Sequence, residues 1–139
     1  LFPYTTLFRS DDFLDLDMYQ TLLNVMQNNN LRMLECTYKA VNEKNEIIES
    51  TVDDKQFIIE DAKTAIGKLF MWTGNASLCM RIVDKNLFNG LCIPEGKRVE
   101  DFYTVICLTH NNNGTAIYRY PFYNYLKFLP AIFLALYHL

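Results

Sequence analysis

The last positions of the chain constrain its fold more than any other feature. After Lys127 the sequence runs from Phe128 to Leu139 without an acidic residue, a lysine or an arginine. As an α-helix these twelve residues would rise about 18 Å, whereas the ~30 Å hydrocarbon core of a bilayer needs about 20 residues. Two interpretations are open: a buried helix that ends a globular domain, or the first part of a membrane-spanning helix whose remainder the sequence does not include.

The surroundings of this apolar run favour the membrane-spanning helix. The run has no polar face, so in a protein core this helix would have to be buried on every side. A domain of this size has little interior volume for such a helix. Tyrosines suited to a membrane interface come before it at Tyr120, Tyr123 and Tyr125. Lys127 is placed where its side chain can extend to lipid headgroups. We therefore predict that residues 121–139 begin a membrane-spanning helix and that these four side chains lie at the interface.

Charge is distributed unevenly along the chain. All 16 acidic residues lie at or before Asp101, and after it only Arg119 and Lys127 add a lysine or arginine charge. The formal net charge of −3 offers no basic surface for a phosphate backbone, so we expect no nucleic-acid partner. The composition, which is 50% hydrophobic, excludes a disordered tail, and 139 residues are enough for one domain or part of a larger one.

The first ten residues are expected to be non-native. From Leu1 to Ser10 the sequence looks like the translation of a short-read sequencing adapter, with a match at every position. Segments of this kind are excluded from fold reasoning, and the missing signal peptide then says nothing about secretion. We divide the chain into a non-native segment at 1–10, a β-rich extracellular fragment at 11–120 and the start of a membrane-spanning helix at 121–139.

Hydrophobic periodicity predicts an α+β fold of mainly short antiparallel strands. Residues 11–27 carry early aspartates and then apolar residues at four-residue spacing, which indicates an N-terminal amphipathic helix. Alternation predicts a strand at 34–40, and a meander of three short strands accounts for 32–60. Residues 62–72 stay ambiguous because Gly67 interrupts a pattern that could begin a helix.

The second half of this region carries the strongest strand signal. Alternation at 78–83 predicts one strand, and 102–109 is β-branched and aromatic throughout, which makes it the clearest predicted strand of the chain. The turn at Asn113-Gly114 lets 115–118 return as its hairpin partner. The predicted fold ends in the apolar, truncated transmembrane helix.

The cysteines, Cys36, Cys79, Cys92 and Cys107, are even in number and widely spaced. Four cysteines allow three pairings, and sequence alone cannot choose among them. We expect the Cys79–Cys107 disulfide first, because both cysteines lie on predicted strands, and this leaves Cys36 with Cys92. The alternative is four buried free thiols in a cytosolic protein.

Two N-x-S/T sequons fall in predicted turns, at Asn75 and Asn113, and are candidate glycosylation sites. Bridged cysteines, sequons in turns and a downstream membrane helix all agree with an extracellular domain. No catalytic constellation emerges. Cys107 and His110 have a C-x-x-H spacing, but zinc needs a second close pair, and a nucleophile-base pair needs an orienting third group. We expect no catalytic residue, no metal, no cofactor and no enzyme activity.

The segment from Gly67 to the end resembles the membrane-proximal part of insect Methuselah-like G-protein-coupled receptors. The resemblance rests on an apolar lead-in, a cysteine-containing step, a hydrophobic strand with a cysteine and a Tyr-Pro step, which are residues 67–70, 77–80, 105–108 and 120–121. It implies a β-rich, disulfide-bonded ectodomain that leads into a seven-helix bundle. The implied partners are an extracellular ligand, the membrane and a G protein bound by the remainder of the receptor, and the implied location is the plasma membrane.

Two other interpretations stay open. One is a single-pass membrane glycoprotein with an ectodomain that binds other proteins. The other is a fragment of a soluble intracellular enzyme whose cysteines are free thiols. The receptor fragment, which would bind a ligand outside the cell and bias a helical bundle that signals, is the function that the sequence favours.

Overall fold

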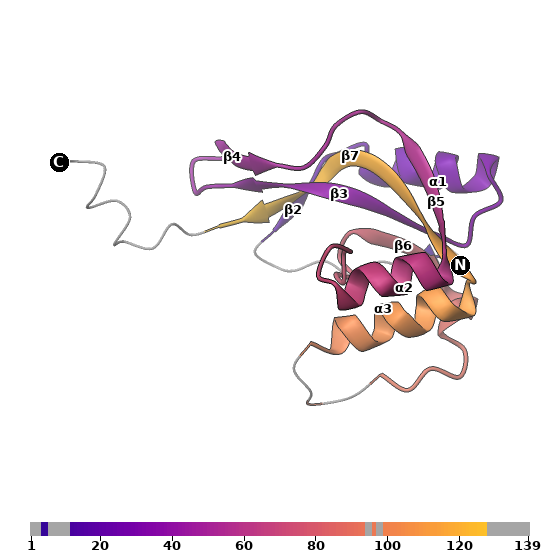
Figure 1. Cartoon of the computed structure of the whole chain (residues 1–139). Coiled ribbons are helices and arrows are strands. Elements are labelled where there is room, and N and C mark those ends of the chain that lie inside the picture. The colour runs from indigo at the N-terminus through magenta and orange to yellow at the C-terminus, as the bar shows by residue number, and fades with distance from the viewer. Residues whose placement is uncertain (1–3, 6–11, 94–95, 97–98, 128–139) are drawn as a thin grey trace.

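The computed structural model describes residues 4–5, 12–93, 96 and 99–127. They form a seven-stranded mixed sheet with helices on both of its faces (Figure 1). In chain order the elements are β1 (Tyr4–Thr5), β2 (Phe13–Leu14), α1 (Met18–Asn28), β3 (Met33–Val41), β4 (Ile47–Ser50), β5 (Phe57–Asp61), α2 (Ala62–Phe70), β6 (Arg81–Asp84), the 3-10 helix η1 (Lys85–Phe88), α3 (Glu100–Asn111) and β7 (Gly114–Leu126).

The centre of the sheet is a parallel pair, β3 and β7. Glu35 lies opposite Ile117, and the register shifts by an irregularity between Cys36 and Tyr38. Around this pair the strands run in the order β1-β6-β3-β7-β2, with β4 also paired to β3 and β5 also paired to β7. Every pairing other than β3 with β7 is antiparallel. The predicted fold of mainly antiparallel strands is therefore corrected to a mixed sheet, since two strands far apart in the sequence form its parallel core.

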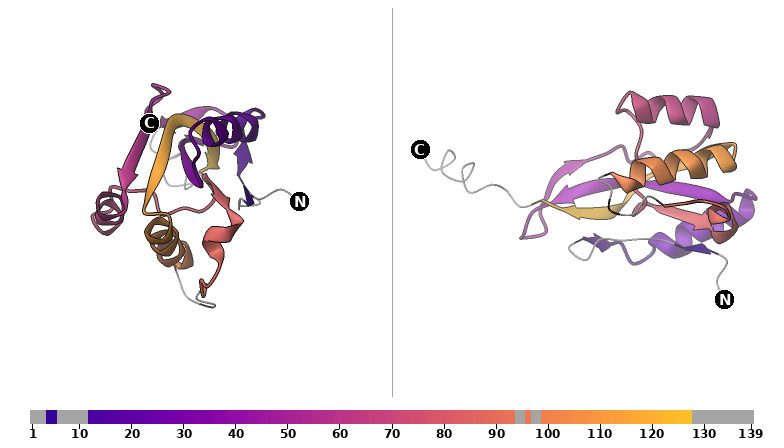
Figure 2. Two further views of the ribbon diagram at one scale, coloured as in Figure 1. Left: turned by 90° about the vertical axis from the view of Figure 1, so that its right-hand side faces the viewer. Right: turned by 90° about the horizontal axis from the view of Figure 1, so that it is seen from below.

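Each face of the sheet has its own hydrophobic core, as side-chain alternation along a strand requires. Leu34 of β3 packs with α1, whereas the preceding Met33 packs with α2 and α3 on the other face. On β6 the neighbours Ile82 and Val83 divide in the same way. Figure 2 shows α1 on the side of the sheet opposite α2 and α3.

The predicted N-terminal amphipathic helix is present, but it begins later than predicted. α1 starts at Met18, and the four-residue spacing of Met18, Leu22 and Met26 places these fully buried side chains on one face. The aspartates of 11–17 precede the helix. The predicted strand at 34–40 is also present, as β3.

The ambiguous segment 62–72 is mostly helical. Asp61 caps α2: its Oδ1 accepts a hydrogen bond from the Thr64 backbone N–H at 2.8 Å, which satisfies one of the free donors of the first turn. Gly67 lies in the middle of this helix, where it is exposed. Ala65 and Leu69, four residues apart, carry the buried face.

The segment 102–109, which the sequence suggested as the clearest strand, is part of α3. Thr104, Val105, Leu108 and Thr109 are its buried residues, at spacings that place them on one face of a helix. Glu100 and Asp101 in the first turn favour the positive end of the helix dipole. Packing of this face against α2 and the sheet therefore overrides the β-propensity of the β-branched residues.

The predicted membrane helix is corrected at its beginning. Residues 121–126, its first predicted residues, belong to β7, where Phe122 and Tyr123 are buried in the core beside α1. In this part of β7 the strand pairs with β2 and β3. The run 128–139 lies outside the described residues. Among the residues that are described, no helix is long and apolar enough to cross a bilayer.

Candidate functional site

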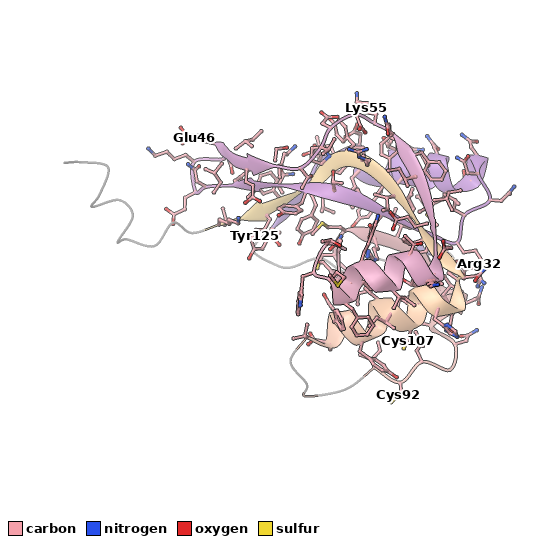
Figure 3. The ribbon with its side chains drawn as sticks, in the orientation of Figure 1. Arg32, Glu46, Lys55, Cys92, Cys107 and Tyr125 are labelled. Carbon is pink, nitrogen blue, oxygen red and sulfur yellow. The ribbon has the colours of Figure 1, made fainter. Side chains whose placement is uncertain are left out.

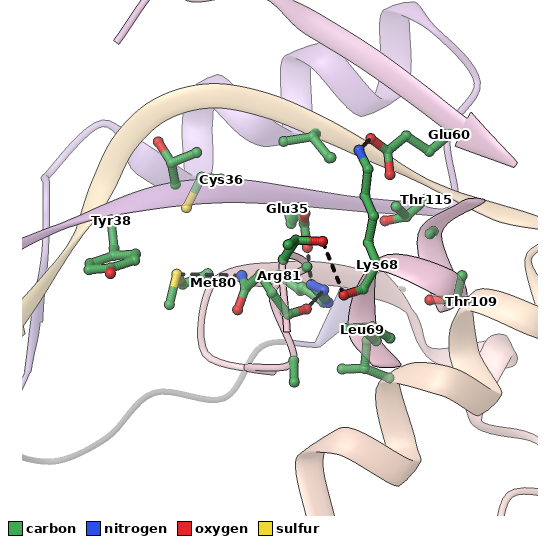
Figure 4. Close-up of a pocket in the computed structure, with 18 of the residues that line it drawn as sticks. Glu35, Cys36, Tyr38, Glu60, Lys68, Leu69, Met80, Arg81, Thr109 and Thr115 are labelled. Atoms are coloured by element: carbon green, nitrogen blue, oxygen red, sulfur yellow. Dashed lines mark hydrogen bonds and ion pairs between the residues drawn. The ribbon is translucent and has the colours of Figure 1, made fainter. Parts of the chain in front are cut away.

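A cavity of about 510 Å³ lies on the α2 side of the sheet. Its walls come from the middle of β3, from β5 and β7, from α2 and α3, and from the loop between α2 and β6 (Figure 4). Glu35, Lys68 and Arg81 bring charge into it, and Thr37, Thr109 and Thr115 bring hydroxyl groups. A volume of this size is within the range of small-molecule sites.

A buried ion pair lies in the wall of the cavity. An Nη of Arg81 donates to the carboxylate of Glu35, and the other Nη donates to the backbone carbonyl of Asn75. The two charged side chains are 3% and 7% exposed. Burial raises the pKa of Glu35, and the guanidinium of Arg81 opposes that rise. Removing either partner would leave an uncompensated charge inside the protein.

A second ion pair lies beside the first. Lys68 of α2 donates to the carboxylate of Glu60 at the end of β5, and Figure 4 shows this pair next to Glu35 and Arg81. Both Glu60 and Lys68 act electrostatically on Glu35, Glu60 raising its pKa and Lys68 lowering it. The four groups carry two positive and two negative charges, so the charged wall of the cavity is neutral overall.

Three residues that line the cavity each carry a buried polar atom without a hydrogen-bond partner among the described residues. These atoms are the hydroxyls of Thr37 and Thr115 and the Nε of Arg81. A buried polar group without a partner costs about 1–3 kcal/mol. Such atoms are rare in folded proteins and need an explanation, such as a bound water or ligand. Their concentration around one cavity marks it as the candidate site.

A smaller pocket of about 270 Å³ lies beside this cavity. Tyr38 and Met80 line both spaces. The smaller pocket adds Asp12, whose carboxylate accepts hydrogen bonds from the Tyr123 hydroxyl and the Leu126 backbone N–H. We call these two neighbouring spaces together the sheet cleft.

The four cysteines are free thiols in the structure, so neither of the two expected disulfides is present. Cys36 lies on β3 at the wall of the larger cavity, but it is 1% exposed and packs in the core with α1, and this burial raises its pKa to about 12. Cys79 is buried in the core on the α1 side. Cys107 is on α3 rather than on a strand, and Figure 3 shows it on the same side of the molecule as the exposed Cys92.

The other predicted site residues are scattered. Asn75 lies in the loop after α2, where its Oδ1 accepts from the Ser77 backbone N–H, and Asn113 is exposed in the turn before β7. Glycosylation of either residue stays a prediction. Of the residues assigned to a membrane interface, Tyr123 is buried in the core and Lys127 pairs with Glu49.

The two remaining interface residues also belong to β7. The ring of Tyr120 packs against Phe122 at 4.4 Å between centroids, and the ammonium of Lys55 lies over it. Tyr125 lies near the end of the strand and lines the smaller pocket (Figure 3). These residues thus belong to the sheet and its cleft.

Sequence reasoning missed the buried ion pair, although a local signal was present. Glu35 stands between Leu34 and Cys36, and Arg81 stands between Met80 and Ile82. A charged residue within an apolar strand segment indicates burial with a partner. The partners are 46 positions apart, so the sequence gives no means of matching them. Within the described part of the chain, no group of three or more His, Cys, Asp or Glu side chains could hold a metal ion.

Comparison with known proteins identifies the fold. No family model and no curated protein sequence matches the chain. Among solved structures, it is similar to residues 1–349 of S. aureus TarS, determined in complex with UDP-GlcNAc, with a TM-score of 0.70. The similarity covers 92% of this chain at 15% identity, and 36% of the TarS chain. At this identity the likeness shows a shared fold, over about a third of the neighbour's length.

This likeness corrects the receptor interpretation. The fold matches that of a protein crystallised with a nucleotide sugar, and nothing in it resembles a Methuselah-like receptor ectodomain. The expected G protein came from that resemblance, whereas the extracellular ligand, the membrane partner and the plasma-membrane location also came from the predicted membrane helix. All of these expectations are corrected. The expectation that the chain is not an enzyme rested on the receptor interpretation and is corrected with it.

Proposed function

We propose that the chain is part of an enzyme that transfers a sugar from a nucleotide donor, and that the sheet cleft belongs to its substrate-binding region. The observation that carries this proposal is the shared fold over 92% of the chain with a protein that binds UDP-GlcNAc. The cleft supports it independently, because it is a concave space with both aromatic and charged walls, as small-molecule sites are.

The chemistry of such a transfer sets what the protein must provide. An acceptor hydroxyl attacks the anomeric carbon of the sugar, the bond from that carbon to the diphosphate breaks, and the hydroxyl proton passes to a base. Binding both substrates in one cleft turns this into a reaction between neighbours. The sheet cleft, with about 510 and 270 Å³ for its two neighbouring spaces, has room for two groups side by side.

Nucleotide binding tests the proposal directly. The isotope-labelled chain is titrated with UDP-GlcNAc, with UDP and, as a control, with ATP, and backbone amide shifts are followed by NMR. We expect saturable shifts with UDP-GlcNAc and UDP at residues that line the sheet cleft, and weaker ones with ATP. The absence of any saturable response to both uridine compounds would contradict the proposal.

Matched tyrosine variants locate the response. Tyr38 lines both spaces of the cleft, whereas Tyr103 is exposed on α3 and lines neither. We expect Tyr38→Ala to weaken UDP-GlcNAc binding and Tyr103→Ala to leave it unchanged. Equal loss in the two variants would place the binding outside the cleft.

A further inference from the structure

We infer that the larger cavity of the sheet cleft binds an uncharged saccharide unit, with Trp72 packing on its ring at the rim and Arg81, Thr37 and Thr115 as hydrogen-bonding groups inside. The inference deepens the proposed function and rests on it, because it assigns the acceptor of the transfer to this cavity. It names the chemical class of that acceptor: a neutral ligand with several hydroxyl groups.

The charge of the cavity wall argues for a neutral ligand. Each cation in it already has a carboxylate partner, Arg81 with Glu35 and Lys68 with Glu60. A phosphate or carboxylate ligand would bring a further negative charge near two carboxylates, and this repulsion disfavours its binding. A sugar hydroxyl carries no charge and can both donate and accept hydrogen bonds, so it suits a wall that is already balanced.

The unpartnered atoms argue for a ligand with several polar groups. Thr115 is 7% exposed and Arg81 is 3% exposed, yet the Thr115 hydroxyl and the Arg81 Nε have no partner among the described residues, and neither has the Thr37 hydroxyl. The hydroxyls can donate or accept, and the Nε can only donate. A ligand rich in hydroxyl groups can serve both kinds of partner.

The rim of the cavity adds the apolar contact that a sugar ring needs. Trp72 lines the cavity and is 80% exposed. Its ring stacks on Phe102 of α3, with centroids 5.9 Å apart and planes 27° from parallel, so its orientation is supported from behind. The backbone of Trp72 has a φ of 58°, in the left-handed region that side chains other than glycine rarely adopt. This conformation is common at the residue that follows a helix C-cap, and it ends α2 at this point.

The chain offers a direct test, because Trp72 is its only tryptophan. Its fluorescence is followed while N-acetylglucosamine, cellobiose, glycerol or inorganic phosphate is added. We expect a saturable change in emission with at least one of the two saccharides, and none with phosphate or glycerol. A saturable response to phosphate alone, or no saturable response to either saccharide, would overturn the inference.

Threonine-to-valine variants make the test specific to the cavity. Thr115→Val replaces an unpartnered buried hydroxyl with a methyl group, and Thr21→Val makes the same change on α1, on the other face of the sheet. We expect Thr115→Val to weaken saccharide binding roughly three- to tenfold, the effect of one lost hydrogen bond, and to unfold at a higher temperature than the wild type. Thr21→Val should bind as the wild type does. Unchanged saccharide affinity in Thr115→Val would contradict the assignment of that hydroxyl.

Calorimetry on two further variants examines the rim. Trp72→Phe should retain most of the saccharide affinity, and Trp72→Ala should lose most of it.

Comparison with the uridine titration separates the two proposals. A response to UDP-GlcNAc and UDP without one to any free saccharide would reject the saccharide cavity alone. Saccharide binding without any response to the uridine compounds would reject nucleotide-dependent transfer and leave a saccharide-binding cavity.

Discussion

At the scale of single residues, the pair formed by Glu35 and Arg81 is the most consequential contact of the molecule. Both side chains are almost fully buried, and the pair joins β3 to β6 and to the loop at Asn75. Buried ion pairs contribute little over a well-packed apolar pair, but breaking one is costly because one charge is left behind. The pair therefore fixes the position of Arg81 at the cleft more than it adds to stability.

Arg81→Met should lower the free energy of unfolding by about 3–5 kcal/mol, measured by urea denaturation. The control is Arg32→Met, which removes the partly exposed ion pair with Asp84 at 2.9 Å and should lower the free energy of unfolding by about 1 kcal/mol or less.

The stability of Arg81→Met should also depend on pH. Burial already raises the pKa of Glu35 above its ordinary value of 4.5, and loss of Arg81 raises it further. The loss of stability of Arg81→Met relative to the wild type should therefore be smallest below pH 4.5 and should grow as the pH rises through the raised pKa of Glu35. Equal losses in the two arginine variants would contradict this account.

At the scale of elements, the caps of α1 and α2 form a natural comparison. Asp61 accepts hydrogen bonds from the backbone N–H and hydroxyl of Thr64, and these bonds lower its pKa. Asp17 occupies the same position before α1 and makes no side-chain cap bond.

Asp61→Ala should therefore lower the melting temperature by a few degrees at neutral pH, whereas Asp17→Ala should change it little. A lowered pKa means that the contribution of Asp61 is present above its ordinary pKa of 3.8 and is lost as the pH falls through the lowered value. The melting temperatures of wild type and Asp61→Ala should thus converge in acid. A difference that persists undiminished well below that pH would rule out the capping carboxylate as its cause.

Substitutions at two glycines compare a close backbone contact between two strands with an open position on a helix. Gly114 begins β7 with a φ of 142°, and a Cβ there would overlap the carbonyl oxygen of Glu60 on β5. Gly67 lies inside α2 with nothing within 4 Å of its missing Cβ. Gly114→Ala should lower the free energy of unfolding by more than about 2 kcal/mol, and Gly67→Ala should raise it by about 0.5–1 kcal/mol. Chemical denaturation of both variants checks the signs, and a harmless Gly114→Ala would show that β5 and β7 can separate without cost.

The elements also show how far the sequence could be interpreted. α1 and β3 were predictable because their signals, four-residue spacing and alternation, depend only on neighbouring residues. α3 was not, because its β-branched composition favoured a strand, and only its packing against α2 and the sheet decides between the two. Tyr123 and Tyr125 were assigned to a membrane interface, but the same amphipathic rings also suit a half-buried strand, and both belong to β7.

The candidate site was less predictable than the elements. Its walls come from β3, β5, β7, α2 and α3, and its residues meet only through tertiary contacts. Glu35 and Arg81 each stood out as charged residues in apolar surroundings, but their pairing depends on the antiparallel register of β3 with β6. Trp72 lies in a segment without a clear hydrophobic pattern, so its position at the cavity rim could be recognised only from the structure.

At the scale of the whole molecule, the cysteines report on global stability. Cys92 is exposed, whereas Cys36 and Cys79 are buried in the core on the α1 side. Burial raises the pKa of Cys36 to about 12, so at neutral pH little of the reactive thiolate is present in the folded state. In native buffer we expect a thiol reagent to modify Cys92 first, and Cys36 and Cys79 only at the rate of unfolding, as resolved by mass spectrometry. Rapid labelling of Cys36 in the folded protein would contradict the described core.

The parallel pairing of β3 with β7 also affects how the chain comes to fold. β7 forms hydrogen bonds with β2, β3 and β5 and is the last described strand, so the centre of the sheet has to wait for it. Until the ribosome has made β7, the edge of β3 that pairs with β7 has no partner strand. The apolar side chains that pack against β7 in the folded protein stay exposed during this time. Contacts between such distant segments slow folding and prolong exposure to aggregation. Nascent chains of this fold should therefore depend on chaperones until β7 has emerged.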